Sequence, residues 1–323
     1  MINYTPDYES LPELVCEYLR YIDVIKNRSQ KTVFEYSINL REFIVFVLTD
    51  KKICDEKNIN MKLCDVEFFR HITLDDAYKY LSYCKNKKNN NSSTRARKVV
   101  AIRQFFKYLS DNKQLLANNP MKVLDSPKTK KALPKYLTLE QSINLLQSVD
   151  GKNKERDYAI LTLFLNCGLR LSELVALNYN DIKSDNSMRV LGKGNKERIV
   201  YLNDACIDAV KAYMRVRPKD GVVDKNALFL STRLKRISPK TVQYIVKSFL
   251  EKSGLGELGM SVHKLRHTAA TLMYQYGDAD VLVLKDVLGH ENLSTTEIYT
   301  HIVDDQKKKA IENNPLSKLK KDD

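Results

Sequence analysis

"HKLRHTAATLMYQYG", His263–Gly277, is the most informative stretch of this chain, because it combines a helical pattern with a cluster of strong hydrogen-bond donors. At helical spacing His263, Arg266 and His267 share one side, and the other side is apolar. The pattern predicts a helix with a buried apolar stripe and a cationic polar edge. An arginine set among histidines in this way can hold a phosphate group.

Two other uses of paired histidines compete with phosphate binding. Histidines four apart on a helix can share a zinc ion, as in the HExxH motif. Here Lys264 stands where that motif has its glutamate, and no Cys, Asp or Glu is close in sequence as a third ligand. The two histidines can also simply be hydrogen-bonded in a protein core. Phosphate binding requires further cationic groups elsewhere in the chain.

Length and charge narrow the functional classes. A chain of 323 residues suits two domains, each with its own core. The formal net charge is +14, and Lys and Arg outnumber Asp and Glu both in residues 1–133 and in residues 134–323. Two basic domains suit a polyanion held between them, although a basic surface can also be merely solvated.

Cysteine usage and hydropathy predict a soluble cytoplasmic protein. The six cysteines form no CxxC pair, which favours free thiols in a reducing compartment. The amino terminus is polar and acidic, unlike a signal peptide. The longest apolar run, around 159–165, is too short to span a bilayer.

Helical periodicity dominates the first third of the chain. Apolar residues in 32–49 recur at a helical period, and Thr73 and Thr138 each begin a capping box. Ser93 is the predicted N-cap of the helix "TRARKVVAIRQFFKYLS". Its cationic side chains away from most of the apolar stripe are Arg97, Arg103 and Lys107. Such a face is either solvated or in contact with a DNA backbone.

A segment rich in proline and lysine, 124–133, is predicted to link two domains. It separates an amino-terminal helical domain, 1–123, from a second domain, 134–323, that ends in a carboxy-terminal tail. The second domain is mainly helical with one interruption. Two predicted strands, Met188–Leu191 and Arg198–Leu202, flank the turn "GKGNKE" and form a hairpin.

Two of the required cations lie in this second domain. In "NCGLRLSELVAL", Gly168 can end one helix in the left-handed conformation and Ser172 can cap the next. Arg170 lies in the turn between them, where backbone groups would hold its guanidinium, unless it only pairs with Glu173. Lys193, between two glycines at the hairpin tip, can swing into a neighbouring site or be no more than part of a turn.

The last segment with side chains that could take part in a reaction is "LGHENLSTTEIYTH". His290 follows a glycine, Ser294 can cap a short helix, and Tyr299 would lie on that helix. A single tyrosine is more often a packing residue than a nucleophile, and this chain has 18 tyrosines. Whether Tyr299 is a nucleophile therefore has to be judged together with the other motifs.

Taken together, these motifs resemble those of the tyrosine recombinases, the integrase family of site-specific DNA recombinases. The family order is Arg, Lys, His-x-x-Arg, His or Trp, and then Tyr. The matching residues here are Arg170, Lys193, His263, Arg266, His290 and Tyr299. The strings "GLRLSEL", "GKGNKER", "LRHTAAT" and "LGHENLSTTEIYTH" look most like the Xer subgroup.

The resemblance implies a fold and a set of partners. The expected fold is mainly α with a small β-hairpin, arranged as a two-domain C-shaped DNA clamp. A helical core-binding domain would precede the tyrosine-recombinase catalytic domain. The implied partners are a double-stranded recombination site and three further protomers, in a homo- or hetero-tetramer on two DNA sites. A DNA translocase or a second recombinase can act as an accessory factor, and no membrane is involved.

The resemblance also implies a reaction that needs no metal, cofactor or ATP. Tyr299 would attack the phosphodiester, leaving a 3′-phosphotyrosine and a free 5′-hydroxyl. Arg170 and Arg266 would neutralise the charge on the nonbridging oxygens. His263 would serve as general base or proton relay, and Lys193 as the acid for the leaving oxygen.

Three further residues have implied supporting roles. His290 would hydrogen-bond a nonbridging oxygen, whereas Glu173 and His267 would support the residues that contact the phosphate. The leading function is Xer-like recombination, including chromosome dimer resolution during partition and cell division. An integrase of a phage or mobile element, a type IB topoisomerase and a DNA-binding factor that never cuts remain the alternatives.

Overall fold

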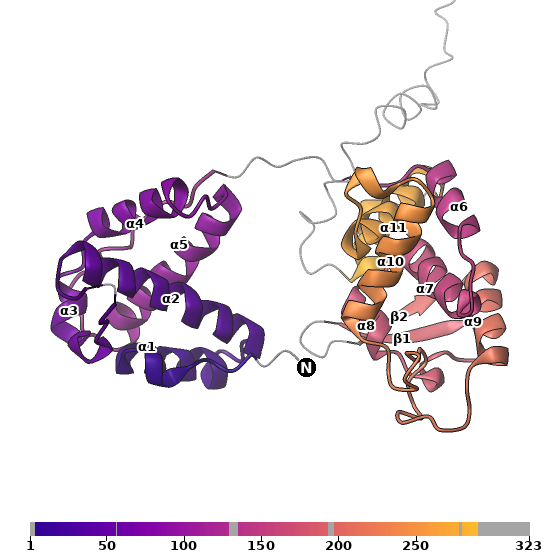
Figure 1. Ribbon diagram of the computed structural model, residues 1–323, viewed down its shortest axis with the longest axis horizontal. Coiled ribbons are helices and arrows are strands. Elements are labelled where there is room, and N and C mark those ends of the chain that lie inside the picture. Colours follow the sequence, from indigo (N-terminus) through magenta and orange to yellow (C-terminus); the bar gives the residue numbers. More distant parts are fainter. Residues whose placement is uncertain (1–3, 56, 129–134, 193–196, 278–279, 290–323) are drawn as a thin grey trace, which may run out of the picture. The chain divides into compact units, whose positions relative to one another are not determined.

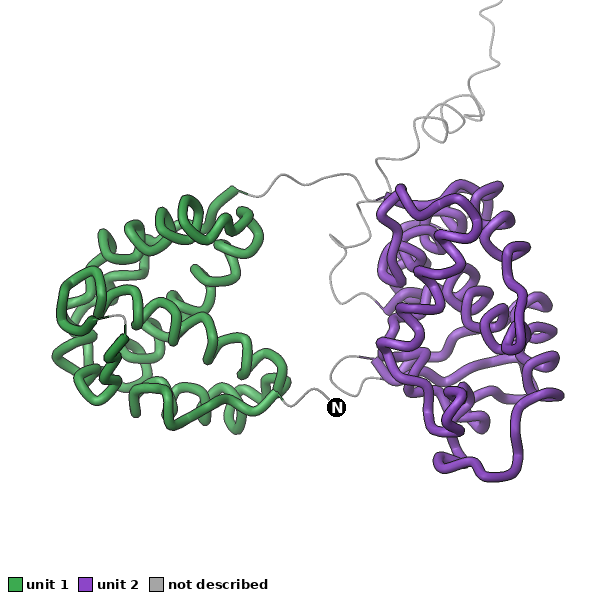
Figure 2. The backbone as a smooth tube through the Cα atoms, viewed as in Figure 1, with its two compact units in different colours: residues 1–131 green, residues 132–323 purple. Residues whose placement is uncertain are grey.

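The computed structural model describes residues 4–55, 57–128, 135–192, 197–277 and 280–289 (Figure 1). The chain divides into two compact units, Met1–Lys131 and Ala132–Asp323 (Figure 2). Each unit has its own hydrophobic core. Leu124, at the start of the predicted linker, is buried in the core of the first unit.

The first unit is built from helices only, within the residues described. They are α1 (Glu13–Arg20), α2 (Gln30–Asp50), α3 (Val66–Arg70), α4 (Leu74–Asn86) and α5 (Ser92–Lys107). The long helix α2 packs against α1, α4 and α5 (Figure 1). Aromatic rings fill the core, where Phe105 and Phe106 each make a T-shaped contact with Phe69.

Local capping explains where these helices begin. The helix predicted over 32–49 is α2, and the hydroxyl of Ser29 accepts a hydrogen bond from the backbone N–H of Thr32. The capping box at Thr73 is confirmed. The prediction for Ser93 is wrong, because Asn91 caps α5 instead. Asparagine is as good an N-cap as serine, and it precedes Ser93, so the helix begins two residues earlier.

The second unit combines helices with one hairpin. Its helices are α6 (Leu139–Gln147), α7 (Lys154–Cys167), α8 (Leu171–Ala176), α9 (Asp204–Val216), α10 (Pro239–Lys252), α11 (Val262–Tyr276) and α12 (Val281–Leu288). The capping box of Thr138 with Gln141 begins α6, as predicted. Helix α7 is buried along the apolar run 159–165 and packs against α6, α9, α10 and α11. It is therefore the central helix of this unit.

The predicted hairpin is present, but β1 begins one residue earlier than predicted, and β2 both begins and ends one residue earlier. Strand β1 (Ser187–Leu191) pairs antiparallel with β2 (Glu197–Tyr201), and Val190 lies opposite Arg198. Met188, Val190 and Val200 are buried, and Arg189, Leu191, Ile199 and Tyr201 are exposed. Ser187, at the start of β1, is buried as well. The class predicted from the sequence, mainly α with a small hairpin in two units, is confirmed. Among the described residues, no helix is long and apolar enough to cross a membrane.

Candidate active site

The turn between α7 and α8 positions Arg170. Gly168 ends α7 with φ 59°, in the left-handed region that was predicted for it. A side chain on Gly168 would also place its Cβ 2.7 Å from Cδ2 of Leu288. Arg170 itself is the N-cap of α8, so the prediction that Ser172 caps this helix is wrong. The reason is Glu173, whose carboxylate accepts the backbone N–H of Arg170 at 2.7 Å.

Glu173 is the anionic centre of a cluster of three arginines. Its side chain is fully buried. Its carboxylate accepts hydrogen bonds from Arg170 Nη1 at 2.6 Å and from both terminal nitrogens of Arg198, at 2.5 and 3.1 Å. Arg266 Nη1 lies 3.9 Å from Oε2 of the same carboxylate. We call Arg170, Glu173, Arg198 and Arg266 the arginine cluster.

The charges of this cluster do not cancel. Burial alone would raise the pKa of Glu173, but the hydrogen bonds and charge of Arg198, and the hydrogen bonds of Arg170, lower it overall. Glu173 is therefore ionised at neutral pH. Three guanidinium groups then face one carboxylate, which leaves two positive charges for an anion such as a phosphate.

Arg266 is more buried than the sequence pattern predicted. Its side chain, expected on a cationic polar edge of α11, is only 3% exposed. Nη1 donates to the carbonyl of Gly168 at 2.7 Å, and Nη2 donates to the carbonyl of Leu288 at 2.6 Å. These carbonyls belong to the ends of α7 and α12, where the backbone lacks helical donors. The guanidinium is buried because it donates hydrogen bonds to carbonyls at both helix ends that have no partner within their own helix.

Arg170 shows both of the arrangements that the sequence left open. It pairs with Glu173, and its Nη2 also donates to the backbone carbonyl of Gly289 at 2.7 Å. Its side chain is 31% exposed, compared with 12% for Arg198 and 3% for Arg266. Arg170 is thus the arginine of the cluster that solvent, or a ligand, reaches most easily.

The two histidines lie on the first turns of α11. Their rings meet edge to face, with centroids 4.7 Å apart. Partial burial, and then the charges of Arg266 and Arg170, lower the pKa of His263. Burial, with the charges of His263 and Arg266, lowers the pKa of His267 to about 4. Both rings are therefore neutral near pH 7, and a neutral imidazole can accept a proton.

Three of the predicted site residues, Lys193, His290 and Tyr299, lie outside the described residues. The structure brings together Arg170, Glu173 and Arg266, with His263 within reach of the arginine charges. Within the described ranges no group of three or more His, Cys, Asp or Glu is arranged to hold a metal ion.

Sequence reasoning missed Arg198. In the predicted strand this residue shares a face with Val200, because alternate residues of a strand point the same way. A charged residue on the apolar face of a strand needs a buried partner. That signal was present, and the partner is the fully buried carboxylate of Glu173.

The cationic residues predicted to contact DNA lie in the first unit. Arg97, Arg103 and Lys107 are all exposed on α5. Their neighbour Lys98 is buried instead, and it pairs with Glu42. The exposed face of α5 is thus cationic and available to a ligand.

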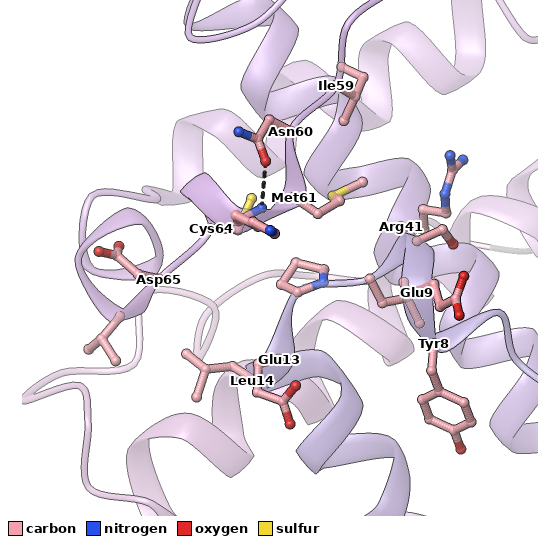
Figure 3. Close-up of a pocket in the computed structure, with 15 residues that line it drawn as sticks. Tyr8, Glu9, Glu13, Leu14, Arg41, Ile59, Asn60, Met61, Cys64 and Asp65 are labelled. Atoms are coloured by element: carbon pink, nitrogen blue, oxygen red, sulfur yellow. Dashed lines mark hydrogen bonds between the residues drawn. The ribbon is translucent and has the colours of Figure 1, made fainter.

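A hollow of about 840 Å³ also lies in the first unit (Figure 3). Glu9, Glu13 and Asp65 line it together with Arg41 and Lys62. This mixture of charges does not favour a polyanion. The hollow shares no residue with the arginine cluster.

Two family models match separate parts of this chain. The model described as "Phage integrase family" matches residues 135–306. The model described as "Phage integrase, N-terminal SAM-like domain" matches residues 15–113. Both parts of the chain therefore resemble the corresponding parts of integrases.

Curated relatives agree with these matches. A tyrosine recombinase XerC from Caldanaerobacter subterraneus subsp. tengcongensis is 50% identical over 310 residues, covering 95% of this chain and 88% of the relative. A tyrosine recombinase XerC from Psychromonas ingrahamii is 33% identical over 299 residues, covering 91% of this chain and 93% of the relative.

Solved structures show the same fold. XerH site-specific recombinase bound to palindromic difH substrate has a TM-score of 0.68 at 20% identity, covering 97% of this chain and 98% of that chain. A lambda integrase dimer bound to a COC′ core site (residues 75–356 of the integrase) has a TM-score of 0.65 at 16% identity, covering 88% of this chain and 96% of that chain. The chain therefore belongs to the phage integrase family and is a Xer-like tyrosine recombinase, an enzyme of site-specific DNA recombination.

Proposed function

We propose that Tyr299 is the nucleophile of this recombinase and that Arg170 and Arg266 of the arginine cluster bind the scissile phosphate. The observation that carries the proposal is the unbalanced charge around Glu173, where three guanidiniums face one carboxylate. Arg170, as the most exposed of the three, contacts the phosphate directly. Arg266 adds its charge from the buried side of the site.

The proposed cleavage step conserves atoms and charge. The phenolic oxygen of Tyr299 forms a bond to phosphorus, and the bond from phosphorus to the 5′-oxygen breaks. The phenolic proton passes to His263, which is neutral near pH 7, and Lys193 protonates the departing 5′-oxygen. Each arginine contact that strengthens in the transition state contributes about 2–4 kcal/mol. His290 donates to a nonbridging oxygen.

Rejoining is the reverse reaction. The 5′-hydroxyl of a second DNA strand attacks the phosphotyrosine, and Tyr299 leaves as a phenol. The energy of the original phosphodiester is retained in the protein–DNA ester, so the proposed reaction consumes no ATP. Glu173 and His267 support the residues around the phosphate without contacting it.

The proposed biological role is recombination at a chromosomal site in the cytoplasm, which resolves chromosome dimers. The XerC relatives support this role over integration of a mobile element, because one of them is 50% identical across nearly the whole chain. Four protomers, in a homo- or hetero-tetramer, would hold two DNA sites. Residues 1–123, including Arg97, Arg103 and Lys107, would contact the duplex, as would residues 134–323.

Covalent trapping tests both the nucleophile and the role. Wild-type protein, denatured rapidly in cells, should carry DNA covalently attached, and Tyr299→Phe should carry none while still binding DNA. Sequencing the attached DNA should identify one chromosomal site. Attachment at the ends of a mobile element would assign the chain to integration, and adduct formation by the Phe variant would exclude Tyr299 as the nucleophile.

A further inference from the structure

Arg198 makes contacts beyond its pair with Glu173. Its Nε donates to the carbonyl of Val287, near the end of α12, at 3.2 Å. Nη1 and Nη2 meanwhile hold both carboxylate oxygens of Glu173. One side chain, 12% exposed, therefore connects strand β2, helix α8 and helix α12.

The three arginines of the cluster bind three consecutive carbonyls at the end of α12. Arg198 binds the carbonyl of Val287, Arg266 that of Leu288, and Arg170 that of Gly289. The last carbonyls of a helix lack helical partners and carry the negative end of its dipole. The cluster thus supplies both donors and positive charge to this helix end.

Close packing makes the arrangement specific. Gly289 ends α12 with φ 64°. A Cβ on this glycine would lie 2.8 Å from Cδ and 3.3 Å from Nε of Arg198. The backbone therefore leaves α12 directly against the Arg198 side chain, and His290 is the next residue in the sequence.

We propose that Arg198 is a positioning residue for strand cleavage, which holds Glu173 and the end of α12 in register around the phosphate site. This inference rests on the proposed function of the arginine cluster. Through Glu173, Arg198 orients the guanidinium of Arg170. Through Val287, it fixes the helix end from which the chain continues to His290. Arg198 itself does not contact the phosphate.

The proposal has a consequence for pH dependence. The charged groups that face Glu173 are Arg170 from the start of α8, Arg198 from β2 and Arg266 from α11. Removing Arg198 removes hydrogen bonds and a positive charge that lower the pKa of Glu173, so that pKa rises. Protonation of Glu173 releases Arg170. Protonation of His263 lowers cleavage on the acid side in both proteins. In an Arg198 variant, protonation of Glu173 should add a further loss of cleavage that begins at a higher pH than in the wild type.

Single-turnover cleavage of a recombination-site duplex over a range of pH values tests this. Arg198→Met should slow covalent adduct formation about 10²-fold, the cost of a misplacement of roughly 1 Å. The acid limb of its pH profile should move upward, because Glu173 loses the hydrogen bonds and positive charge that lower its pKa. Arg198→Lys should return the acid limb toward the wild-type position, because it restores a charge beside Glu173, while remaining slower because one ammonium cannot hold both Glu173 and Val287.

Arg236→Met is the matched control. Arg236 pairs with Asp224 and donates to the carbonyls of Val175, Ala176 and Leu177 at the end of α8. It thus makes the same kinds of bond as Arg198 without touching the arginine cluster. Its loss should lower the thermal midpoint and leave the pH profile in place.

A double variant isolates the route through Glu173. Because glutamine does not titrate, Arg198→Met should cause no movement of the acid limb in a Glu173→Gln background. Wild-type adduct formation establishes the proposed function independently. If the wild type forms the adduct but folded Arg198→Met cleaves with the wild-type rate and pH profile, the positioning role is wrong. An acid limb that still moves in the double variant would also overturn it.

Discussion

At the scale of single residues, the site depends on a carboxylate that is buried among cations. Glu173 is fully enclosed, and each of its oxygens accepts more than one hydrogen bond. A charge removed from water is tolerated only when it is paired and hydrogen-bonded. Loss of Glu173 would leave Arg198 and Arg266 as buried charges without an anion.

The stability of the fold should therefore depend on Glu173. We expect Glu173→Gln to lower the free energy of unfolding by roughly 3–5 kcal/mol at pH 7. Because the pKa of Glu173 is lowered in the folded protein, its contribution is present above the ordinary value of about 4.3. The contribution is lost as pH falls through the folded pKa. Urea unfolding at pH 7 and at about pH 3 should show a smaller difference between wild type and variant at the lower pH.

Glu67→Gln provides the comparison for Glu173→Gln. Glu67 forms an exposed pair with Arg70, with both side chains more than half exposed. Such surface pairs contribute about 0–1 kcal/mol. Equal destabilisation by the two substitutions would contradict the importance assigned to burial of Glu173.

A second prediction at the scale of single residues concerns Lys193 as the acid for the leaving oxygen. If Lys193 protonates the leaving 5′-oxygen, Lys193→Ala should slow cleavage by about 10²–10⁴-fold. A 5′-bridging sulfur leaves as a thiolate, whose parent thiol has a pKa of about 8.5, and it needs little protonation. Cleavage rates on a 5′-phosphorothiolate site should then be nearly equal for wild type and Lys193→Ala.

Arg170→Ala is the control for that experiment. Its positive charge acts on the nonbridging oxygens, so sulfur substitution at the leaving position should not restore its activity. A Lys193→Ala enzyme that fails equally on oxygen and sulfur substrates would show that Lys193 binds the phosphate without acting as an acid.

At the scale of elements, the site is assembled where helix ends meet. The carboxyl ends of α7 and α12 and the amino end of α8 converge on the arginine cluster. Glycines at two of these ends allow the close approach. The end of α7 packs on α12 because Gly168 presents no side chain to Leu288.

Gly168→Ala should therefore cost more than the backbone conformation alone. A left-handed φ costs a non-glycine residue roughly 1–2 kcal/mol, and here the new Cβ would also lie 2.7 Å from Leu288 Cδ2. Gly254→Ala is the matched control, because Gly254 has φ 73° with nothing within 4 Å of the new Cβ. Urea unfolding followed by circular dichroism should show the larger loss for Gly168→Ala. A loss no greater than that of the control would mean that Leu288 adapts without cost.

At the scale of the whole molecule, charge decides how the chain meets DNA. The formal net charge is +14, but many exposed cations of the first unit already pair with carboxylates. Arg97, Arg103 and Lys107 of α5 make none of the ion pairs found among the described residues. Their charges are accordingly the better candidates for phosphate contacts.

Salt dependence of duplex binding tests this assignment. Replacing Arg97, Arg103 and Lys107 together by alanine should weaken binding at every sequence. It should also reduce the slope of log affinity against log salt by about 0.9 for each phosphate that the protein no longer neutralises. The control replaces Arg20, Arg70 and Lys79, which are exposed but paired with acidic neighbours. Equal changes in slope for the two triple variants would show that only net charge matters.

What the sequence determined by itself concerns local structure and family. The capping boxes at Thr73 and Thr138 and the left-handed turn at Gly168 could be predicted because each depends on residues within a few positions. The family could be identified because its chemistry requires particular side chains in a particular order. Even local prediction failed where two equally good caps competed, as for Ser93 and Asn91.

Only the tertiary structure decided how the arginines are used. The contacts of Arg198 with Glu173 and Val287, and of Arg266 with Gly168 and Leu288, join residues far apart in the chain. Periodicity can show that a charged side chain lies on an apolar face and needs a buried partner. It does not show which partner, because that depends on which helix ends come together. A buried guanidinium requires hydrogen-bond acceptors, here backbone carbonyls without helical partners and a carboxylate. Those acceptors come together only when the chain has folded.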